Sequence, residues 1–207
     1  MSDPLPRSRV KPILLDLRFP ILTPRLLIRP AAPGDGPALY AAKVESLVEL
    51  RRWMPWARVE MSVEESEQSC REAYLRCLAR EDLRLYLFDR ETRALVGGSG
   101  LHRIDWEQRI FEIGYWVRKT RVGAGYVTEA VNAIARYAFG PLEAKRVSIH
   151  CNASNLKSRA VAERLGFPLE GVLHNDDRAA GPEVSCRDHA IYARTSSEGL
   201  PPLDVSW

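Results

Sequence analysis

A short glycine-containing segment in the middle of the chain has the residue types of an anion-binding turn. It runs from Arg121 to Thr128 (RVGAGYVT), follows an apolar strand pattern and leads into an amphipathic helical pattern. Gly123 and Gly125 let a ligand approach the main chain, and the free N–H groups of a first helical turn carry partial positive charge. Arg118 and Arg121 place basic side chains beside it. The segment therefore predicts a phosphate or pyrophosphate site.

The turn lacks the full signature of either common nucleotide loop. The Gly-Lys-Ser/Thr of a Walker loop is missing, and Thr128 stands where a dinucleotide fingerprint has its third glycine. A second glycine cluster, at Gly97, Gly98 and Gly100, is followed by neither a lysine nor a helical pattern. We interpret these three as strand glycines that admit a close neighbour. The turn alone does not identify its ligand.

The composition is that of a globular protein without a strong bias toward one kind of partner. Charged residues make up 28% of the 207 residues, and the formal charge of +3 is too small to indicate direct nucleic-acid binding. The N-terminal segment lacks the apolar core of a signal peptide, and no window approaches the roughly 20 apolar residues of a membrane span. We expect a soluble, cytoplasmic protein without a membrane partner.

The four cysteines show no metal-binding spacing. Cys70, Cys77, Cys151 and Cys186 include no C-x-x-C pair and no histidine at zinc-ligand spacing. We expect buried free thiols and no metal site, as is usual in a reducing compartment.

The alternation of strand and helix patterns predicts an α+β fold. Strands are expected at 25–29, 83–89, 94–101, 109–117, 144–151, 169–173 and 185–194. Helices are expected at about 35–50, from a capping box at Ser62 and Glu65 to about residue 80, after the glycine turn to about 139, and at 155–165. This order predicts a mixed, mostly antiparallel sheet of about seven strands with helices on both faces.

We expect one domain over residues 1–207. The proline- and arginine-rich residues 1–20 predict an irregular lead-in, and residues 195–207 predict a mobile tail. Leu203, Val205 and Trp207 are apolar enough to dock on a neighbouring surface.

Two tryptophans flank a proline after the first helical pattern. Trp53 and Trp56 lie beside Arg51 and Arg52. Large aromatic side chains usually pack into a core or a lid. Next to basic residues they also have the character of a substrate-pocket wall, and the pattern alone does not separate the two interpretations.

A second cluster of polar residues follows the strand at 144–151. Asn152, Asn155 and Ser158 lie at the strand end and in the first helical turn, and Gly166-Phe167 follows that helix. Together with the Arg-x-Gly-x-Gly-Tyr-x-x-Glu-Ala pattern of 121–130, this cluster resembles the GNAT superfamily of acyl-coenzyme A-dependent N-acetyltransferases.

Within that superfamily, the chain is most similar to the RimJ/RimL group, which acetylates protein N-termini, notably those of ribosomal proteins. The similar segments are TPRL at 23–26, LRRWMPW at 50–56, GYW at 114–116, TEA at 128–130 and DHAIY at 188–192. The resemblance implies a centrally splayed sheet, acetyl-CoA as the cofactor, and a protein N-terminus or small amine as the acceptor. Relatives are often dimers, so a homodimer is a further expectation.

The resemblance also implies a set of cofactor-binding residues. The strands 111–117 and 144–151 would splay apart, so that the pantetheine arm lies between them like an added strand. Asn152 and Asn155 match asparagines that bind the pantetheine end, although a turn or helix cap explains each equally well. The full set is Trp116, Val117, Arg118, Arg121, Val122, Gly123, Ala124, Gly125, Tyr126, Asn152 and Asn155.

Attack of an amine on a thioester needs a deprotonated amine, a stabilised oxyanion and a proton for the departing thiolate. Ala162 replaces the tyrosine that donates this proton in much of the superfamily. Ser158, at the position of the RimJ/RimL serine, is implied as the donor, with an ordinary first-turn serine as the alternative.

The resemblance leaves two carboxylates as candidates for the base. Glu112 lies on the central strand and Asp177 in the loop after Gly171, and a salt bridge or simple solvation would explain either. An α-amine has a reference pKa of about 7.7–8.0, well below that of lysine, so a modest base or a water relayed by either carboxylate suffices.

Two residues depart from the group's pattern. Thr120 stands where a glutamine or arginine is usual, three residues before the first glycine, and the possible base Asp177 is shorter than the usual glutamate. The first departure affects the cofactor contacts and the second affects the catalytic role of Asp177.

Three hypotheses about function follow. The first is an acetyltransferase of protein N-termini. The second is the same fold acting on a small amine or antibiotic, or with a larger acyl donor, with Trp53 and Trp56 enclosing a compact pocket. The third is a coenzyme A-binding regulatory module without turnover.

Overall fold

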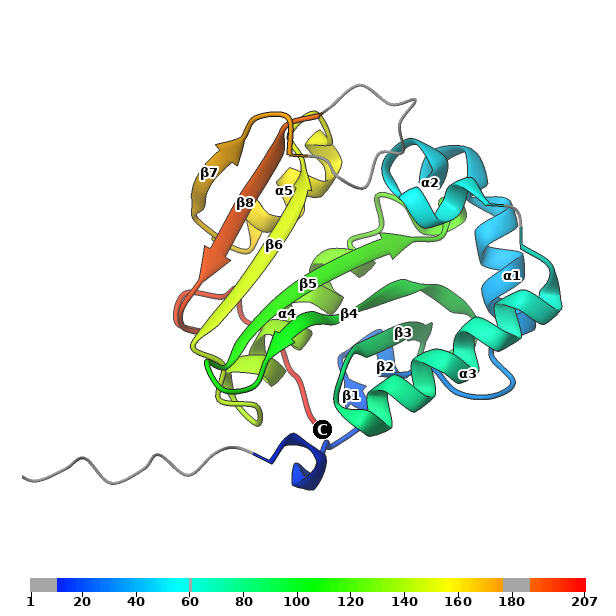
Figure 1. Cartoon of the computed structure of the whole chain (residues 1–207), viewed down its shortest axis with the longest axis horizontal. Coiled ribbons are helices and arrows are strands. Elements are labelled where there is room, and N and C mark those ends of the chain that lie inside the picture. Colours follow the sequence, from blue (N-terminus) through cyan, green and yellow to red (C-terminus); the bar gives the residue numbers. More distant parts are fainter. Residues whose placement is uncertain (1–10, 60, 177–186) are drawn as a thin grey trace, which may run out of the picture.

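The computed structural model describes residues 11–59, 61–176 and 187–207. Within these residues, one sheet of eight strands has the order β1-β2-β3-β4-β5-β6-β8-β7 (Figure 1). The strands are β1 (Ile21–Leu22), β2 (Leu26–Pro30), β3 (Leu83–Asp89), β4 (Leu95–Asp105), β5 (Ile110–Val117), β6 (Arg146–Asn152), β7 (Leu169–Leu173) and β8 (His189–Arg194). Only the β5–β6 pair is parallel among these strands. The α+β class and the antiparallel meander are confirmed.

Helices cover both faces of the sheet. They are α1 (Gly36–Glu45), α2 (Leu47–Trp53), α3 (Val63–Ala79), α4 (Tyr126–Phe139) and α5 (Leu156–Arg164), with short 3-10 turns η1 (Pro12–Leu14), η2 (Pro55–Arg58) and η3 (Lys119–Arg121). Side chains of α4 and α5 pack into the larger core on one face, and those of α1 and α3 pack with β3 into a smaller core on the other (Figure 1). The sheet thus separates two layers of helices.

The centre of the sheet is splayed, as the family resemblance implied. Strands β5 and β6 pair at three positions only, the last of which joins Glu112 to Ser148. Beyond that position β5 continues to Val117 and β6 to Asn152 without pairing to each other, and the strands diverge (Figure 1). On its other edge, strand β6 pairs with β8 from Val147 to Asn152. The parting leaves two strand edges facing an opening.

The first predicted helix is two helices, which corrects the expectation of one continuous helix over 35–50. Helix α1 ends at Glu45, Ser46 has φ −106° and ψ 7°, and α2 begins at Leu47. The Ser46 hydroxyl accepts a hydrogen bond from the Lys119 amide at 2.9 Å. The helical segment therefore divides at Ser46, where the amide of a distant residue binds the serine hydroxyl. The residues around Ser46 do not predict this long-range contact. Asp35, at the helix start, pairs with Arg29 at 2.7 Å instead of capping with its side chain.

The start of α3 follows its sequence signal. The Ser62 hydroxyl accepts from the Glu65 amide at 3.1 Å, and the Glu65 carboxylate accepts from the Ser62 amide at 2.6 Å. This is the expected capping box, in which the side chain of each residue accepts a hydrogen bond from the otherwise unpaired backbone N–H of the other.

The segment 195–207, for which the sequence predicts mobility, packs on the body of the described structure. The Ser206 amide donates to Leu22 O at 3.1 Å, the Leu22 amide donates to Ser206 O at 2.8 Å, and the Trp207 ring lies 5.7 Å from that of Tyr137. Leu200 is buried, and Leu203 and Val205 pack on the larger core. The apolar docking that the sequence allowed is the arrangement observed.

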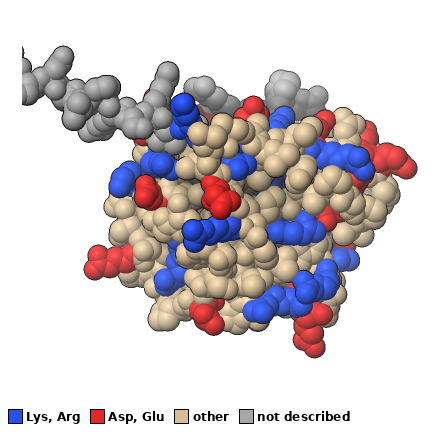
Figure 2. All heavy atoms as spheres, turned by 90° about the horizontal axis from the view of Figure 1, so that it is seen from below, with Lys and Arg blue, Asp and Glu red and all other residues tan. Residues whose placement is uncertain are grey.

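Three of the four cysteines, Cys70, Cys77 and Cys151, are buried free thiols as expected, and Cys186 lies outside the described residues. In the described part of the chain, each helix is too short or too polar to cross a bilayer. On the face seen in Figure 2, basic and acidic side chains of the described residues are interspersed.

Candidate active site

The glycine turn exposes its main chain to a ligand. Gly123 and Gly125 have φ of 82° and 80°, a region that side chains rarely adopt, and a Cβ at Gly123 would meet no atom within 4 Å. Gly125 is the N-cap of α4, and no side chain caps that helix. The residues from Val122 to Gly125 are exposed. The first amides of α4 are therefore available to an anion.

The turn is held from one side by the segment between β1 and β2. Arg25 donates to Ala124 O at 2.8 Å and to the Glu129 carboxylate at 2.6 Å, and its guanidinium stacks 4.5 Å from the centre of the Tyr126 ring. The Thr23 hydroxyl donates to the same carboxylate at 2.6 Å. The Thr-Pro-Arg and Thr-Glu-Ala segments thus form one clamp that fixes the turn, and the Tyr126 side chain belongs to it.

Helix α1 holds the turn from the other side. The Glu45 carboxylate accepts from the Arg118 guanidinium at 2.6 Å and from the Thr120 hydroxyl and amide at 2.7 and 2.9 Å. The two Thr120 hydrogen bonds, with the Arg118 pair, lower the pKa of Glu45 to about 2. Of the two basic side chains that were predicted to support the cofactor, Arg118 is therefore paired within the chain. Arg121 lies 6.0 Å from the Tyr126 ring, beside the turn.

Strand β6 ends at Asn152, whose buried side-chain amide nitrogen has no hydrogen-bond acceptor among the described residues. Asn152 is 8% exposed, and its Nδ2 has no hydrogen-bond acceptor among the described residues. Its Oδ1 accepts from the Ser154 amide at 2.9 Å, which fixes the orientation of the side chain. Asn155 caps α5, because its Oδ1 accepts from the Ser158 amide at 3.2 Å. A buried N–H without an acceptor is costly, so this position suits a ligand carbonyl.

Ser158 lies on the α5 side of the opening, next to a tyrosine of β5. Its hydroxyl donates to Tyr115 Oη at 3.1 Å, and the Tyr115 hydroxyl donates to Ser158 O at 2.9 Å. Burial raises the pKa of the Tyr115 phenol, and burial likewise raises the pKa of the neighbouring Cys151 thiol. Both groups therefore stay protonated near neutral pH. Sequence reasoning did not select the Tyr115 side chain, although the GYW match contains it.

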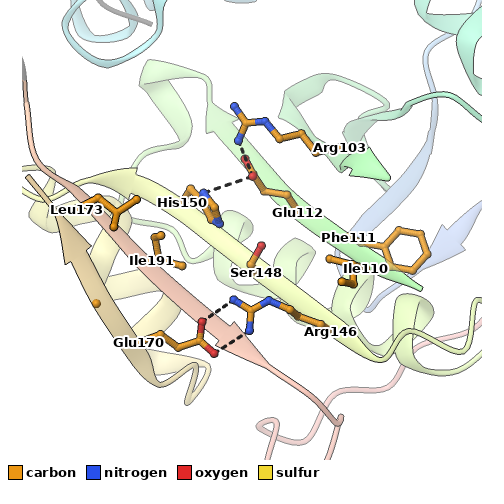
Figure 3. A pocket seen from close by; sticks show the side chains of 11 residues that line it. Arg103, Ile110, Phe111, Glu112, Arg146, Ser148, His150, Glu170, Leu173 and Ile191 are labelled. Atoms are coloured by element: carbon orange, nitrogen blue, oxygen red, sulfur yellow. Dashed lines mark hydrogen bonds and ion pairs between the residues drawn. The ribbon is translucent and has the colours of Figure 1, made fainter. Parts of the chain in front are cut away.

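The opposite face of the same strands carries an open trough of about 380 Å³ (Figure 3). Two ion pairs lie across it: Arg103 Nη1 to Glu112 Oε2 at 2.5 Å, and Arg146 to Glu170 at 2.5 Å. His150 Nδ1 lies 3.5 Å from Glu112 Oε2. Its lining residues are Arg103, Ile110, Phe111, Glu112, Arg146, Ser148, His150, Glu170, Gly171, Leu173 and Ile191. Glu112 is therefore salt-bridged, which was the structural alternative to a role as base, and its side chain also faces the trough.

Of the two tryptophans, Trp56 reaches the splayed strand. Its ring lies 6.0 Å from that of Trp116 in an edge-to-face arrangement, and it lines a cavity of about 240 Å³ with residues of α1 and α2. Trp53 stacks instead under Arg52, at 4.7 Å. Gly98 makes room for Trp116, because a Cβ there would lie 2.5 Å from its Nε1. The strand interpretation of the second glycine cluster is confirmed.

Comparison with known proteins identifies the family. A family model described as "Acetyltransferase (GNAT) domain" matches residues 25–168, which include Arg25 and Glu129 of the clamp, the turn, the splayed strands and α5. This chain belongs to the GNAT acetyltransferases. The resemblance inferred from the glycine turn and the asparagine cluster is confirmed.

Curated GNAT relatives match over part of the chain. A putative ribosomal N-acetyltransferase, YdaF of Bacillus subtilis, is 46% identical over 78 residues, which are 38% of this chain and 43% of the relative. The ribosomal-protein-serine acetyltransferase of Escherichia coli is 35% identical over 79 residues, 38% of this chain and 44% of the relative. The chain thus aligns with less than half the length of either relative.

A solved structure extends the GNAT likeness to most of the chain. The structure titled RimL ribosomal L7/L12 alpha-N-protein acetyltransferase in complex with coenzyme A has a TM-score of 0.77 at 23% identity, and covers 84% of this chain and 96% of its own. At that identity the likeness establishes the fold. GNAT enzymes use acetyl-CoA as the acetyl donor, and the solved relative contains coenzyme A.

The residues of this GNAT chain fit such a donor. The uncapped α4 amides suit a pyrophosphate, the open strand edges suit amide groups, and the Asn152 donor lacks an acceptor. The structure joins Ser158 to Tyr115 of β5, places Trp116 and Val117 on the part of β5 that does not pair with β6, and places Asn152 at the end of β6. Asn155 caps α5, and Glu112 lines the trough. Asp177, the second predicted base, lies outside the described residues.

Proposed function

We propose that this protein transfers the acetyl group of acetyl-CoA to the α-amine of a protein N-terminus, of the kind found on ribosomal proteins. The observation that supports this most strongly is a proton donor and an open trough on opposite faces of one splayed strand pair. Ser158 and Tyr115 lie on the α5 face, and Glu112 lies on the trough face. A ligand held between β5 and β6 is accessible from both.

The donor half of the site follows the family. The amides over Val122–Tyr126 hold the pyrophosphate, the exposed edges of β5 and β6 hold the pantetheine amides, and a main-chain N–H near Tyr115 or Trp116 polarises the carbonyl of the thioester. When bound, acetyl-CoA supplies an activated acyl group with a good leaving group.

The chain's own residues move the protons. The Ser158 hydroxyl, which donates to Tyr115 Oη in the ligand-free chain, turns its proton to the departing thiolate, while the Tyr115 hydroxyl stays bonded to Ser158 O and holds the residue in place. The amine attacks directly from the trough face in a ternary complex, where ionisable side chains receive its proton. A direct attack predicts intersecting double-reciprocal plots in steady-state kinetics.

Two observations favour a protein N-terminus over a compact amine. The trough is open along β5, β6 and β8, so a chain can extend away from the reacting nitrogen (Figure 3). Two of the curated relatives are named as a ribosomal or a ribosomal-protein acetyltransferase. An α-amine, with a pKa of about 7.7–8.0, also loses its proton far more readily than a lysine side chain.

Thiol release with matched acceptors tests the proposal. Peptides that begin with serine should release coenzyme A, and the same peptides with a blocked α-amine and a free lysine should not. Turnover with a panel of small amines instead of the peptides would support the second hypothesis. Binding of coenzyme A without thiol release from any acceptor would support a regulatory module.

A further inference from the structure

One histidine of the trough has the geometry of a proton acceptor. His150 is on β6, two residues beyond Ser148, where the pairing of β5 with β6 ends. Its side chain therefore lines the trough beside the unpaired part of β6. An amine that approaches the opening from the trough passes this imidazole.

A carboxylate on the neighbouring strand lies beside the imidazole. Nδ1 of His150 lies 3.5 Å from Glu112 Oε2, and the Glu112 side chain is 16% exposed (Figure 3). Arg103, on β4, donates to the same oxygen at 2.5 Å from the solvent side, which fixes the carboxylate. With its proton on Nδ1, toward Glu112, the histidine keeps a lone pair on Nε2.

Burial, more than the surrounding charges, lowers the pKa of His150 and keeps the imidazole neutral near pH 7. Burial lowers the pKa of the imidazole below its usual 6.5, and Arg103, His189 and Arg146 act in the same direction, whereas Glu112 raises it. Glu170, on β7, adds a second carboxylate near the trough, but Arg146 pairs with it at 2.5 Å. A neutral imidazole can receive a proton from an amine.

The proton donor and this acceptor lie on opposite faces of the sheet. Side chains alternate along a strand, so on β5 Tyr115 and Glu112 point to opposite faces, and on β6 so do Cys151 and His150. Tyr115 reaches Ser158, and Cys151 packs in the α5 core, whereas Glu112 and His150 line the trough. The thiolate can thus receive a proton on one face of the sheet while the acceptor amine loses a proton on the other face.

We propose that His150 is the catalytic residue that accepts the proton of the acceptor amine, and that Glu112 is a positioning residue that orients its imidazole. This rests on the proposed acetyl transfer. The amine nitrogen bonds to the carbonyl carbon, the carbon–sulfur bond breaks, and the nitrogen's proton goes to His150 Nε2. The thiolate sulfur takes the hydroxyl proton of Ser158, which the serine regains from water. His150 then releases its proton to water in the open trough. No oxidant or reductant takes part.

The test compares His150→Gln and Glu112→Gln with the exposed-histidine control His174→Gln, using a serine-initiated peptide. His150→Gln should lower kcat at least about 100-fold and remove the acidic limb of the pH–rate profile, with the KM for acetyl-CoA nearly unchanged. Glu112→Gln should lower kcat about tenfold and shift that limb to lower pH, because the carboxylate raises the pKa of His150. His174→Gln should match the wild type, since its side chain is 79% exposed.

An NMR titration of His150 in the ligand-free chain gives a readout independent of turnover, and should show a neutral imidazole at pH 7. A cationic imidazole at pH 7 would overturn the proposal.

Two kinetic results would also overturn it. One is a His150→Gln enzyme with the wild-type kcat and the wild-type acidic limb of the pH–rate profile. The other is loss of turnover in Glu112→Gln alone, which would make Glu112 the proton acceptor. If His150→Gln does not fold, His150→Asn replaces it, with the same expected kcat and the same expected pH–rate profile. A wild type that acetylates small amines but no peptide contradicts the proposed acceptor only, and the variants are then compared on that amine.

Discussion

Ser158 is held by two hydrogen bonds to one neighbour. Its hydroxyl donates to Tyr115 and its carbonyl accepts from the same phenol, while its amide is capped by Asn155. This geometry fits a hydroxyl kept at a fixed position toward the opening.

Replacing Ser158 with alanine should lower kcat about 10- to 100-fold, because the departing thiolate loses its proton donor. The dissociation constant of coenzyme A should change less than about threefold, since the cofactor contacts of the main chain remain. Steady-state kinetics and calorimetry measure the two effects. Ser154→Ala, an exposed serine of the same loop, is the matched control. Equal kcat in both variants would remove Ser158 from the chemistry.

The buried amide of Asn152 gives a second prediction. Asn152→Asp keeps the oxygen that accepts from Ser154 but replaces the unpartnered donor with a carboxylate. The dissociation constant of coenzyme A should rise at least about tenfold, or 1.4 kcal/mol. Isothermal titration calorimetry measures it, and the exposed Asn175→Asp serves as the control. Unchanged affinity in a folded Asn152→Asp protein would show that this donor does not contact the cofactor.

At the scale of elements, the cofactor turn is clamped by β1–β2 and α4. Glu129, with its side chain 9% exposed, accepts from Thr23 and from the Arg25 side chain and amide. Glu129→Gln removes the charge from this clamp. We expect a loss of about 1–3 kcal/mol in the free energy of unfolding, together with weaker coenzyme A binding.

Urea denaturation compares Glu129→Gln with Glu72→Gln, an exposed glutamate of α3 that contacts Gln68. If both variants unfold at the wild-type urea concentration, the clamp does not stabilise the turn.

A second link joins α1 to the same turn through Glu45. Its folded-state pKa of about 2 lies below its usual 4.5, so the stabilisation is fully present above pH 4.5 and is lost as the pH falls from 4.5 toward 2. Glu45→Gln should lower Tm at neutral pH, and the difference from wild type should shrink across that window. Thermal melts at several pH values measure it. A Tm difference that is constant with pH would rule out the Glu45 contacts as its source.

The sequence predicted those elements whose signals are local. The Ser62–Glu65 capping box, the meander and the glycine turn each depend on residues within a few positions of one another, and all three are confirmed. The family resemblance added the splay, which no local pattern encodes.

The features that the sequence did not predict depend on contacts between distant segments. Strand β1 has two residues, too few for an alternation to appear, and the break at Ser46 is set by an amide 73 residues away. His150 shares one face of β6 with Arg146 and Ser148, which the alternation did show. Its nearness to Glu112, however, follows only from the parallel register of β5 and β6.

For the whole molecule, the proposed acetyl transfer requires one ligand to be reached from both faces of the sheet. The larger core, with α4 and α5, supports the face that carries Ser158, and the trough opens on the other (Figures 1 and 3). Segments from the two halves of the sequence also contact each other: the side chain of Arg187 donates a hydrogen bond to Arg52 O, in α2, at 2.9 Å. The opening is thus framed by elements from both ends of the sequence.

The most direct measurement is the affinity of a bisubstrate conjugate in which coenzyme A is joined through an acetyl linker to the α-nitrogen of a serine-initiated peptide. We expect this conjugate to bind at least about tenfold more tightly than coenzyme A, because it occupies both faces of the splayed strands at once. A conjugate joined through a lysine side chain should gain less. An α-linked conjugate that binds no better than coenzyme A, or worse than the lysine-linked one, would contradict acetyl transfer to a protein N-terminus through this site.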